Sequence, residues 1–284
     1  MQKIAVVVDS GAYIPPEAMG DFSIPVIPLW LIWDGEHFRD GIDIDPPAFY
    51  QRLRQSKSFP TTSQPTALEF VDFFNRVIAD QQADAIVAVL VSSKMSGTMA
   101  SAQAAQAEMT DFPVRLVDSL SISMGMGFPA LAAAKAAAAG KSLDEVVAAA
   151  EDVRDRIQLL GVVGTLEYLH RGGRIGGAKR LLGTALNLKP LLHFEDGHLE
   201  PLTQVRTRRK ALARLLEITE EDLGGRRIAE AAVTDVDCPA EGDELAEMVR
   251  ERFGVSPVHR CVFSPVIGAH AGPGTVALVY YPEA

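Results

Sequence analysis

The sequence predicts an α/β protein of two domains, with a parallel sheet in the first domain and a mixed or antiparallel sheet in the second. In residues 1–157, short β-branched runs alternate with helical segments, which is typical of a parallel sheet covered by helices. In residues 158–284, a short glycine-containing turn at 195–198 joins two strand-like runs, which favours an antiparallel hairpin. Because no low-complexity linker separates the two parts, we expect a tight interface with a cleft between the domains.

The first domain is predicted from strands and helices that alternate along the chain. The run at 85–91 is continuous and apolar, as in a strand that is buried on both faces. The run at 24–33 is also strand-like, but Pro25 and Pro28 favour an edge position. Strands are expected at 4–10, 24–33, 85–91 and 114–119, and helices at 46–55, 66–80 and from Ser96 to about Met109, with a long alanine-rich helix after the last strand.

The second domain is predicted from short apolar runs, only some of which are separated by helical segments. Together with the hairpin turn, this spacing indicates a mixed or antiparallel sheet. The expected strands are 158–164, 188–194, 199–205, 228–235, 257–263 and 275–281, and the expected helices lie near 176–186, 206–222 and 240–253.

Composition narrows the possible functions. The formal net charge of −10 argues against a general nucleic-acid binder, which needs an excess of Lys and Arg. Cys238 and Cys261 are too few for a disulfide framework and lack the spacing of metal ligands, so we expect reduced thiols and no metal. The apolar stretch 119–140 is interrupted by Pro129 and Lys135, which indicates a core helix and no stable membrane insertion. The short apolar N-terminus does not fit a signal peptide, and we expect a soluble cytoplasmic protein.

The segment FPTTSQP (59–65) places three consecutive hydroxyl groups between two prolines. Because proline restricts the backbone, the segment is predicted to be a rigid turn that presents its side chains outward. Thr61, Thr62 and Ser63 could then donate hydrogen bonds to an oxygen-rich ligand group. The alternative is structural, because Ser63 or Gln64 could simply cap the following helix.

A second group of small polar residues follows the buried strand at 85–91. Ser96, Gly97 and Thr98 open a helix at the carboxyl end of that strand, where open α/β sheets bind their ligands. The free N–H groups of a helix N-terminus suit a carboxylate or a phosphate. Ordinary helix capping explains the same residues.

The second half contains a basic region. Residues 171–210 hold nine Lys or Arg against three acidic residues, in a chain whose formal charge is −10. This region is either a solvated basic face or a docking surface for an acidic partner or a phosphorylated group. The glycine-rich part at 168–183 lacks the patterns GxxxxGK[ST] and GxGxxG, so a nucleotide site is only weakly supported.

Near the C-terminus, His270 lies in a loop rich in Gly and Pro before the last predicted strand. Gly268, Gly272 and Gly274 would let the backbone come close to a bulky group, although a lone histidine is more often structural. The chain has no GxSxG motif, which disfavours a serine hydrolase. Asp9 and Ser10 end the first strand and could lie at the same edge of the sheet.

In this order, the motifs resemble those of the DegV family, which includes the fatty-acid-binding subunits of bacterial fatty acid kinase. The resemblance runs almost from end to end, and several motifs in order are more specific than any one of them. The matching segments are VDS at 8–10, FPTTSQP at 59–65, SSKMSGT at 92–98, LHRGGRI at 169–175, LKPLLHFEDG at 188–197, VRTRRKA at 205–211 and IGAHAGPG at 267–274.

The resemblance implies a DegV-like fold of two α/β domains that encloses one long-chain fatty acid and needs no other cofactor. It also implies that the chain is a ligand-binding protein rather than an enzyme acting alone, and we expect it to be a monomer by itself. The acid's carboxylate would meet Thr62 and Ser96 first, with Thr61, Ser63, Gly97, Thr98 and His270 around them.

The same resemblance implies a protein partner. In this reading a separate, ATP-binding fatty acid kinase subunit phosphorylates the bound acid to an acyl phosphate, and Arg174 and Arg206 match basic positions that would contact it. Lys94 and Met95 stand where smaller or aliphatic residues are expected, which could alter the edge of the cleft.

A fatty acid is also reasonable on energetic grounds. Burying about 14 methylenes at roughly 0.8 kcal/mol each gives on the order of 10 kcal/mol before the costs of binding. A buried carboxylate is expensive without donors, so converging hydroxyl and amide groups suit it. Apolar candidates for the tail channel are Met124, Met126, Phe128 and Leu131, which core packing explains equally well.

Two other functions are compatible with the sequence. One is a lipid-sensing or regulatory binding protein without a kinase partner, which would need the same pocket. The other is a stand-alone small-molecule phosphotransferase or hydrolase that uses Ser96 or Thr62 with His270. The missing nucleotide motif and the lack of a second clear base disfavour this enzyme.

Overall fold

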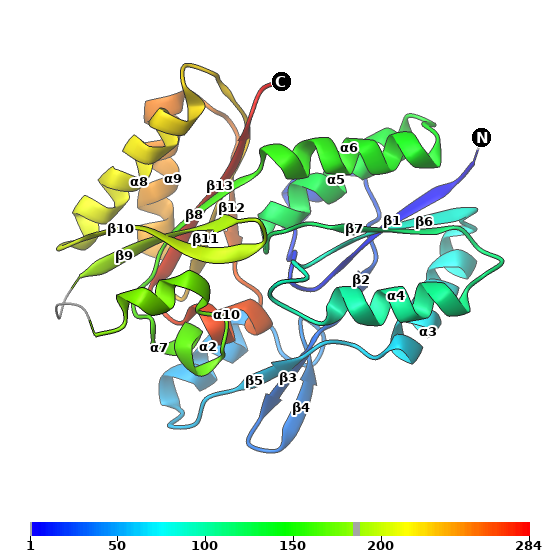
Figure 1. The fold of residues 1–284 in the computed structure, drawn as a ribbon, viewed down its shortest axis with the longest axis horizontal. Coiled ribbons are helices and arrows are strands. Elements are labelled where there is room, and N and C mark those ends of the chain that lie inside the picture. The colour runs from blue at the N-terminus through cyan, green and yellow to red at the C-terminus, as the bar shows by residue number, and fades with distance from the viewer. Residues whose placement is uncertain (1, 184–187) are drawn as a thin grey trace.

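The computed structural model describes residues 2–183 and 188–284 and arranges them around three sheets (Figure 1). A parallel four-stranded sheet has the order β2-β1-β6-β7, and a mixed six-stranded sheet has the order β10-β9-β8-β13-β11-β12. A small antiparallel sheet, β4-β3-β5, lies below and between them in Figure 1. The predicted α/β class, with one parallel and one mixed sheet, is confirmed.

The parallel sheet is buried between two layers of helices. Every residue of β6 is buried, as its continuous apolar sequence predicts. One face packs on α3 and α4 and the other on α5 and α6, because side chains alternate along each strand. The strands are β1 (Ile4–Asp9), β2 (Val26–Ile27), β6 (Ala85–Leu90) and β7 (Val114–Asp118), and the helices are α3 (Ala67–Gln81), α4 (Thr98–Glu108), α5 (Met124–Ala138) and α6 (Leu143–Arg156).

The six-stranded sheet packs one face on two helices and the other on the first half of the chain. The helices α8 (Arg208–Leu223) and α9 (Pro239–Phe253) cover the first face. In the predicted hairpin, Asp196 and Gly197 both have positive φ, as a two-residue turn that matches strand twist requires. The strands are β8 (Gln158–Val162), β9 (Lys189–Glu195), β10 (His198–Val205), β11 (Ile228–Val236), β12 (Val258–Val262) and β13 (Thr275–Pro282).

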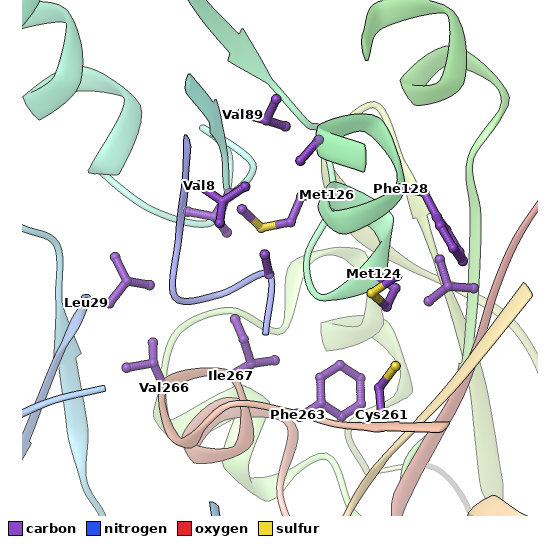
Figure 2. Close-up of a cluster of buried hydrophobic side chains, with 14 of the residues drawn as sticks. Val8, Leu29, Val89, Met124, Met126, Phe128, Cys261, Phe263, Val266 and Ile267 are labelled. Carbon is purple, nitrogen blue, oxygen red and sulfur yellow. The ribbon is translucent and has the colours of Figure 1, made fainter. Parts of the chain in front are cut away.

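One hydrophobic core joins the two large sheets. It contains Val8 from β1 and Cys261 from β12, with the side chains of α5 between them (Figure 2). Met124, Met126, Phe128 and Leu131, the candidates for the tail channel, all lie in this core, as the alternative of core packing expects. Their large apolar side chains fill the space between the sheets.

The small sheet corrects two predictions. The expected strand at 24–33 is two strands, because β2 joins the parallel sheet while β3 (Trp30–Trp33) begins the small sheet after Pro28. The expected rigid turn around Thr62 is the strand β5 (Thr61–Ser63), which pairs with β3. The sheet is completed by β4 (Glu36–Arg39) and is followed by α2 (Pro46–Gln55).

Three short helices complete the fold, together with α1 (Pro16–Met19). The predicted loop around His270 contains α10 (Pro265–Ala271), whose N-cap is Ser264. The predicted helix at 176–186 is the 3-10 helix η1 (Gly176–Leu181), and residues 184–186 of that prediction lie outside the described part of the chain. α7 (Glu167–Arg171) precedes it.

The domain boundary after residue 157 stays a prediction. It coincides with the change of sheet, since α6 ends at Arg156 and β8 begins at Gln158. Across residues 2–183 and 188–284, none of the helices combines the length and the apolar character that a membrane crossing requires.

Candidate functional site

A partly open, mainly apolar pocket, called the channel below, lies where the six-stranded sheet meets the small sheet and the carboxyl ends of β6 and β7. It holds about 890 Å³ of space, its open mouth included. β8 and the residue after it line the channel with alternate side chains, and α10 contributes its inner face. The apolar wall consists of Leu29, Val91, Met95, Ile122, Leu159, Gly161, Val163, Leu169, Leu192, Phe194, Leu199, Phe263, Val266, Ile267, Ala271 and Ala277. Figure 2 shows where this wall joins the core, at Leu29, Phe263, Val266 and Ile267.

Six polar residues of the wall come from separate segments that meet, and a seventh, Thr275, donates its hydroxyl to the Ala271 carbonyl at 2.8 Å. Thr62 on β5 contacts His270 on α10, and Arg174 contacts the backbone beside Ser96. The side chain of Gln64 packs against Gly97, so the two hydroxyl-bearing segments touch each other. We call Thr62, Ser63, Gln64, Ser96, Arg174 and His270 the head-group cluster.

The hydrogen bond between Thr62 and His270 is the central contact of the head-group cluster. Thr62 Oγ1 lies 2.7 Å from His270 Nε2, and the two residues are brought together by strand β5 and helix α10. Pairing of β5 with β3 places Thr62 opposite Leu31. Helix α10 is started by Ser264, whose hydroxyl accepts the N–H of Ile267 at 3.4 Å.

The surroundings of His270 determine which way this hydrogen bond runs. Its Nδ1 is buried without a hydrogen-bond partner against Gly172, where an added Cβ would lie only 2.0 Å from Nδ1. An orphaned buried N–H is rarer and more costly than an unused acceptor. We therefore place the proton on Nε2, which donates to Thr62 and leaves the Thr62 hydroxyl free to donate into the channel.

His270 is neutral at neutral pH. Burial, with a smaller contribution from the positive charge of Arg174, lowers the pKa of its imidazole to about 4. Arg174 is therefore the charged member of the head-group cluster. Its Nε donates to the Met95 carbonyl at 3.1 Å and its Nη1 donates to the Gly172 carbonyl at 2.8 Å. These two hydrogen bonds hold the guanidinium in the wall.

Ser96 is held by its own turn. Its Oγ accepts the N–H of Thr98 at 3.3 Å and lies 2.8 Å from the Thr98 hydroxyl. If the Thr98 hydroxyl donates to Ser96, the Ser96 hydroxyl is free to donate into the channel, as the Thr62 hydroxyl is. The head-group cluster can thus offer two O–H donors and one guanidinium to an anionic group.

The residues that the sequence predicts for the site lie at different depths around the channel. Thr62, Ser63, Ser96 and His270 line it. Thr61 and Gly97 are exposed and Thr98 is fully buried, and these three lie outside the wall. Thr98 acts on the site through its contact with Ser96.

The two arginines predicted as a docking pair lie in different surroundings. Arg174 is half-buried in the channel wall, whereas Arg206 is exposed. Arg174 therefore belongs to the head-group cluster, where the sequence analysis did not place it. The sequence carries no signal for this role, because Arg174 meets the Met95 carbonyl only in the folded chain.

The glycines near His270 serve side-chain packing. A Cβ at Gly268 would lie 2.6 Å from the Tyr50 hydroxyl, and one at Gly272 would lie 2.4 Å from the ring of Tyr168. Gly268 and Gly272 therefore let the backbone come close to a bulky group, as the sequence predicts. They make room for aromatic rings from α2 and α7.

Asp9 and Ser10 do not line the channel. Asp9 is fully buried and accepts the N–H groups of Gly11 and Val91 at 2.8 and 2.7 Å, which fixes the loop after β6. Burial raises the pKa of its carboxyl to about 6. Ser10 bonds Asp40, outside the channel.

The chain is similar along its whole length to known proteins. Residues 3–283 match the family model described as an uncharacterised protein of the DegV family. A DegV domain-containing protein of Streptomyces coelicolor is 41% identical over 97% of this chain and 97% of its own. A fatty-acid-binding DegV family protein from Thermus thermophilus is 33% identical, with a TM-score of 0.92 over 99% of this chain and 100% of its own. DegV of Bacillus subtilis, a fatty acid binding protein, is 32% identical, with a TM-score of 0.90 over 100% of both chains.

Fold and channel together define an α/β protein with a mainly apolar site whose wall also carries hydrogen-bond donors. The resemblance indicated by the sequence motifs is confirmed. The chain belongs to the DegV family.

Proposed function

We propose that this chain binds a long-chain fatty acid, with the acyl chain in the channel and the carboxylate at the head-group cluster. One observation carries the proposal: the wall of an apolar channel includes two hydroxyl groups and a guanidinium that come from distant parts of the chain. The fatty acids bound by the DegV proteins of Thermus thermophilus and Bacillus subtilis support the same ligand class.

The chemistry of the channel matches both ends of such a ligand. Apolar side chains remove the methylenes from water, which supplies most of the affinity. A carboxylate buried without partners would cancel that gain, but hydrogen bonds from Thr62 and Ser96 and the charge of Arg174 compensate for its desolvation. Because His270 is neutral, it orients Thr62 without adding a second charge.

We further propose that the bound acid is presented to a separate ATP-dependent kinase. A carboxylate oxygen would attack the γ-phosphorus of ATP held by that partner, ADP would leave, and the acyl phosphate would remain in the channel. The exposed basic side chain of Arg206, in the basic region at 171–210, supports an electrostatic docking surface. The chain would then be the substrate-carrying subunit rather than an enzyme by itself.

The Thr62–His270 contact also has the geometry of a nucleophile and its base, which keeps a stand-alone hydrolase as an alternative. Such a base needs a third group that orients it and stabilises its positive charge. Here Nδ1 faces Gly172 instead of a carboxylate, and Arg174 opposes protonation of the ring. A lipid-sensing protein without a kinase needs the same channel and differs only in its partner.

Extraction of bound lipid tests the proposal. The purified protein is expected to release a long-chain fatty acid, detected by mass spectrometry after denaturation. Thr62→Ala and Ser96→Ala each remove one proposed hydrogen bond to the carboxylate. The loss of a hydrogen bond to a charged group costs about 1.5–3 kcal/mol, so each variant should bind fatty acid tenfold more weakly or worse. Thr61→Ala and Ser93→Ala, at exposed positions beside them, serve as matched controls. Unchanged affinity in both test variants would exclude these hydroxyls as head-group ligands.

A further inference from the structure

Gly161 lies at the centre of the channel floor, which is the part of the channel wall that the six-stranded sheet forms. Side chains alternate between the two faces of β8, and Leu160 and Val162 pack on the side of α8 and α9. Gly161 therefore faces the channel. It has four neighbours on that face, along the chain and across to β9 and β13, and all of them line the channel: Leu159, Val163, Leu192 and Ala277.

The channel reaches down to the backbone of β8 at Gly161. This glycine is buried. Among the described residues, and apart from its chain neighbours, only Val276 and Ala277 come within 4 Å of a Cβ built there, at 3.8 and 3.7 Å. A buried side chain normally touches neighbours on every side, because protein interiors are close-packed. A side chain at position 161 would instead project into the channel.

Neither backbone conformation nor packing explains a glycine at this position. Gly161 lies outside the left-handed region, whereas Gly197 in the hairpin has φ of +81°. A Cβ at Gly164 would lie 2.6 Å from the Pro273 carbonyl oxygen, but the nearest atom to one at Gly161 is at an ordinary contact distance. Glycine weakens a strand, because the chain loses more freedom on folding and gains no side-chain packing. A strand glycine of this kind is typical of a place where a ligand approaches the backbone.

We propose that Gly161 determines how large an acyl chain the channel accepts, because it lets the chain lie directly on the channel floor. This inference rests on the proposed function and assigns a specificity-determining residue to it. Ala277, the small residue paired with Gly161, widens the channel at the same place. A larger side chain at position 161 would take space that a long acyl chain needs, whereas a short chain still fits beside it.

Competition between two fatty acids tests this role. Protein freed of lipid is incubated with an excess of dodecanoic and octadecanoic acid in equal amounts and re-isolated, and the bound acids are quantified by mass spectrometry. Each methylene excluded from an apolar site lowers affinity about fourfold. The ratio of bound octadecanoic to dodecanoic acid should therefore fall threefold or more in Gly161→Ala and tenfold or more in Gly161→Val. Ala107→Val, an exposed change on α4, should keep the ratio of the parent protein.

Thermal unfolding of the lipid-free protein distinguishes a ligand-binding glycine from a structural one. Gly161→Ala should unfold at a higher temperature than the parent protein, because alanine fits the extended backbone and restricts the unfolded chain. Gly164→Ala should unfold at a lower temperature, since its Cβ would collide with the Pro273 carbonyl. Gly161→Ala is thus expected to gain stability while it loses preference for the longer acid.

Ala277→Val covers the case in which Gly161→Val does not fold. Its added methyl groups enter the channel beside Gly161, and the ratio should again fall threefold or more. An unchanged ratio in Gly161→Ala and Ala277→Val, or a lipid-free Gly161→Ala that unfolds below the parent protein, would overturn the role of Gly161 while fatty acid binding by the parent protein stands. A parent protein that binds neither acid would refute the proposed function itself, and this inference with it.

Discussion

His270 acts at the residue scale as a positioning group. It fixes the Thr62 hydroxyl by one hydrogen bond and remains uncharged because it is buried beside Arg174. The Thr62 hydroxyl is thereby directed toward the place where the carboxylate is proposed to lie. The residue thus links the packing of α10 to the chemistry of the head-group cluster.

Replacing His270 separates this positioning role from simple packing. Glutamine can still donate a hydrogen bond to Thr62, whereas alanine cannot, so His270→Gln should bind a fluorescent fatty acid more tightly than His270→Ala. The loss in the alanine variant should be about tenfold, as expected for one hydrogen bond of about 1 kcal/mol or slightly more. Equal affinities in the two variants would show that only the bulk of the ring matters.

The pH dependence of stability checks the charge state of His270. Its pKa is about 4 in the folded protein and 6.5 unfolded, so its contribution is present above pH 6.5 and is lost as the pH falls toward 4. The free energy of unfolding of the parent protein should therefore fall relative to His270→Gln over that range, by about 3 kcal/mol at most. Asp9 and Asp40 titrate in the same range, but they are present in both proteins and cancel in the difference.

The β9–β10 hairpin is the element that closes the site from the second half of the chain. Its tip docks on the loop after β6, where the Ser92 hydroxyl donates to the Gly197 carbonyl at 2.8 Å. Gly197 has φ of +81°, and a Cβ there would lie 2.7 Å from Ser92 Oγ. The hairpin therefore needs glycine both for its turn and for its contact with the segment that leads to Ser96.

Two glycine variants separate these needs. Gly35, in the turn between β3 and β4, has φ of +82° but no atom within 4 Å of an added Cβ. Gly35→Ala should cost about 1 kcal/mol of backbone strain, and Gly197→Ala should cost more and also weaken fatty acid binding. Thermal unfolding and lipid affinity measure the two effects. A Gly197→Ala variant no worse than Gly35→Ala would mean that the hairpin contact does not matter.

Elements differ in how far the sequence predicts them. The run at 85–91 was predictable because a continuous apolar segment has few alternatives to a buried strand. Strand β5 was not predictable from the sequence, because its three polar residues carry no periodic signal. They form a strand only by pairing with β3. α10 is short and rich in small residues, so its sequence resembles a loop.

The candidate site also contains residues that the sequence predicts and residues that it does not. Thr62, Ser96 and His270 follow from the motifs, because family resemblance carries them position by position. The channel wall does not, since it depends on which face of β8 and β9 turns inward and on how the sheets pack. Only the pairing of distant segments brings Arg174 beside Ser96.

At the scale of the whole molecule, the channel depends on both halves of the chain. β5 and the loop after β6 supply the hydroxyls, while α10, β8 and β9 supply His270 and much of the apolar wall. The continuous core around α5 holds these halves together (Figures 1 and 2). A ligand bound in this channel would therefore contact both halves of the chain.

The proposed docking of a kinase is tested by charge reversal. Arg206→Glu should retain its fatty acid but lose acyl phosphate formation with the kinase and ATP, because it places a negative charge in the basic region. Arg76→Glu, an exposed change on α3, is the matched control. Arg174 does not serve here, since its substitution would also change the head-group cluster. Undiminished turnover by Arg206→Glu would refute its role in docking.

Carbon NMR of bound oleic acid labelled at its carboxyl carbon tests most directly whether the head-group cluster holds a carboxylate. Donors that stabilise the charged form lower a carboxyl pKa, so the bound acid should stay ionised at pH values that protonate a free acid in water. Ser96→Ala and Thr62→Ala should move that pKa upward. A bound carboxyl that titrates like the free acid, and does so unchanged in both variants, would contradict a carboxylate site formed by these residues.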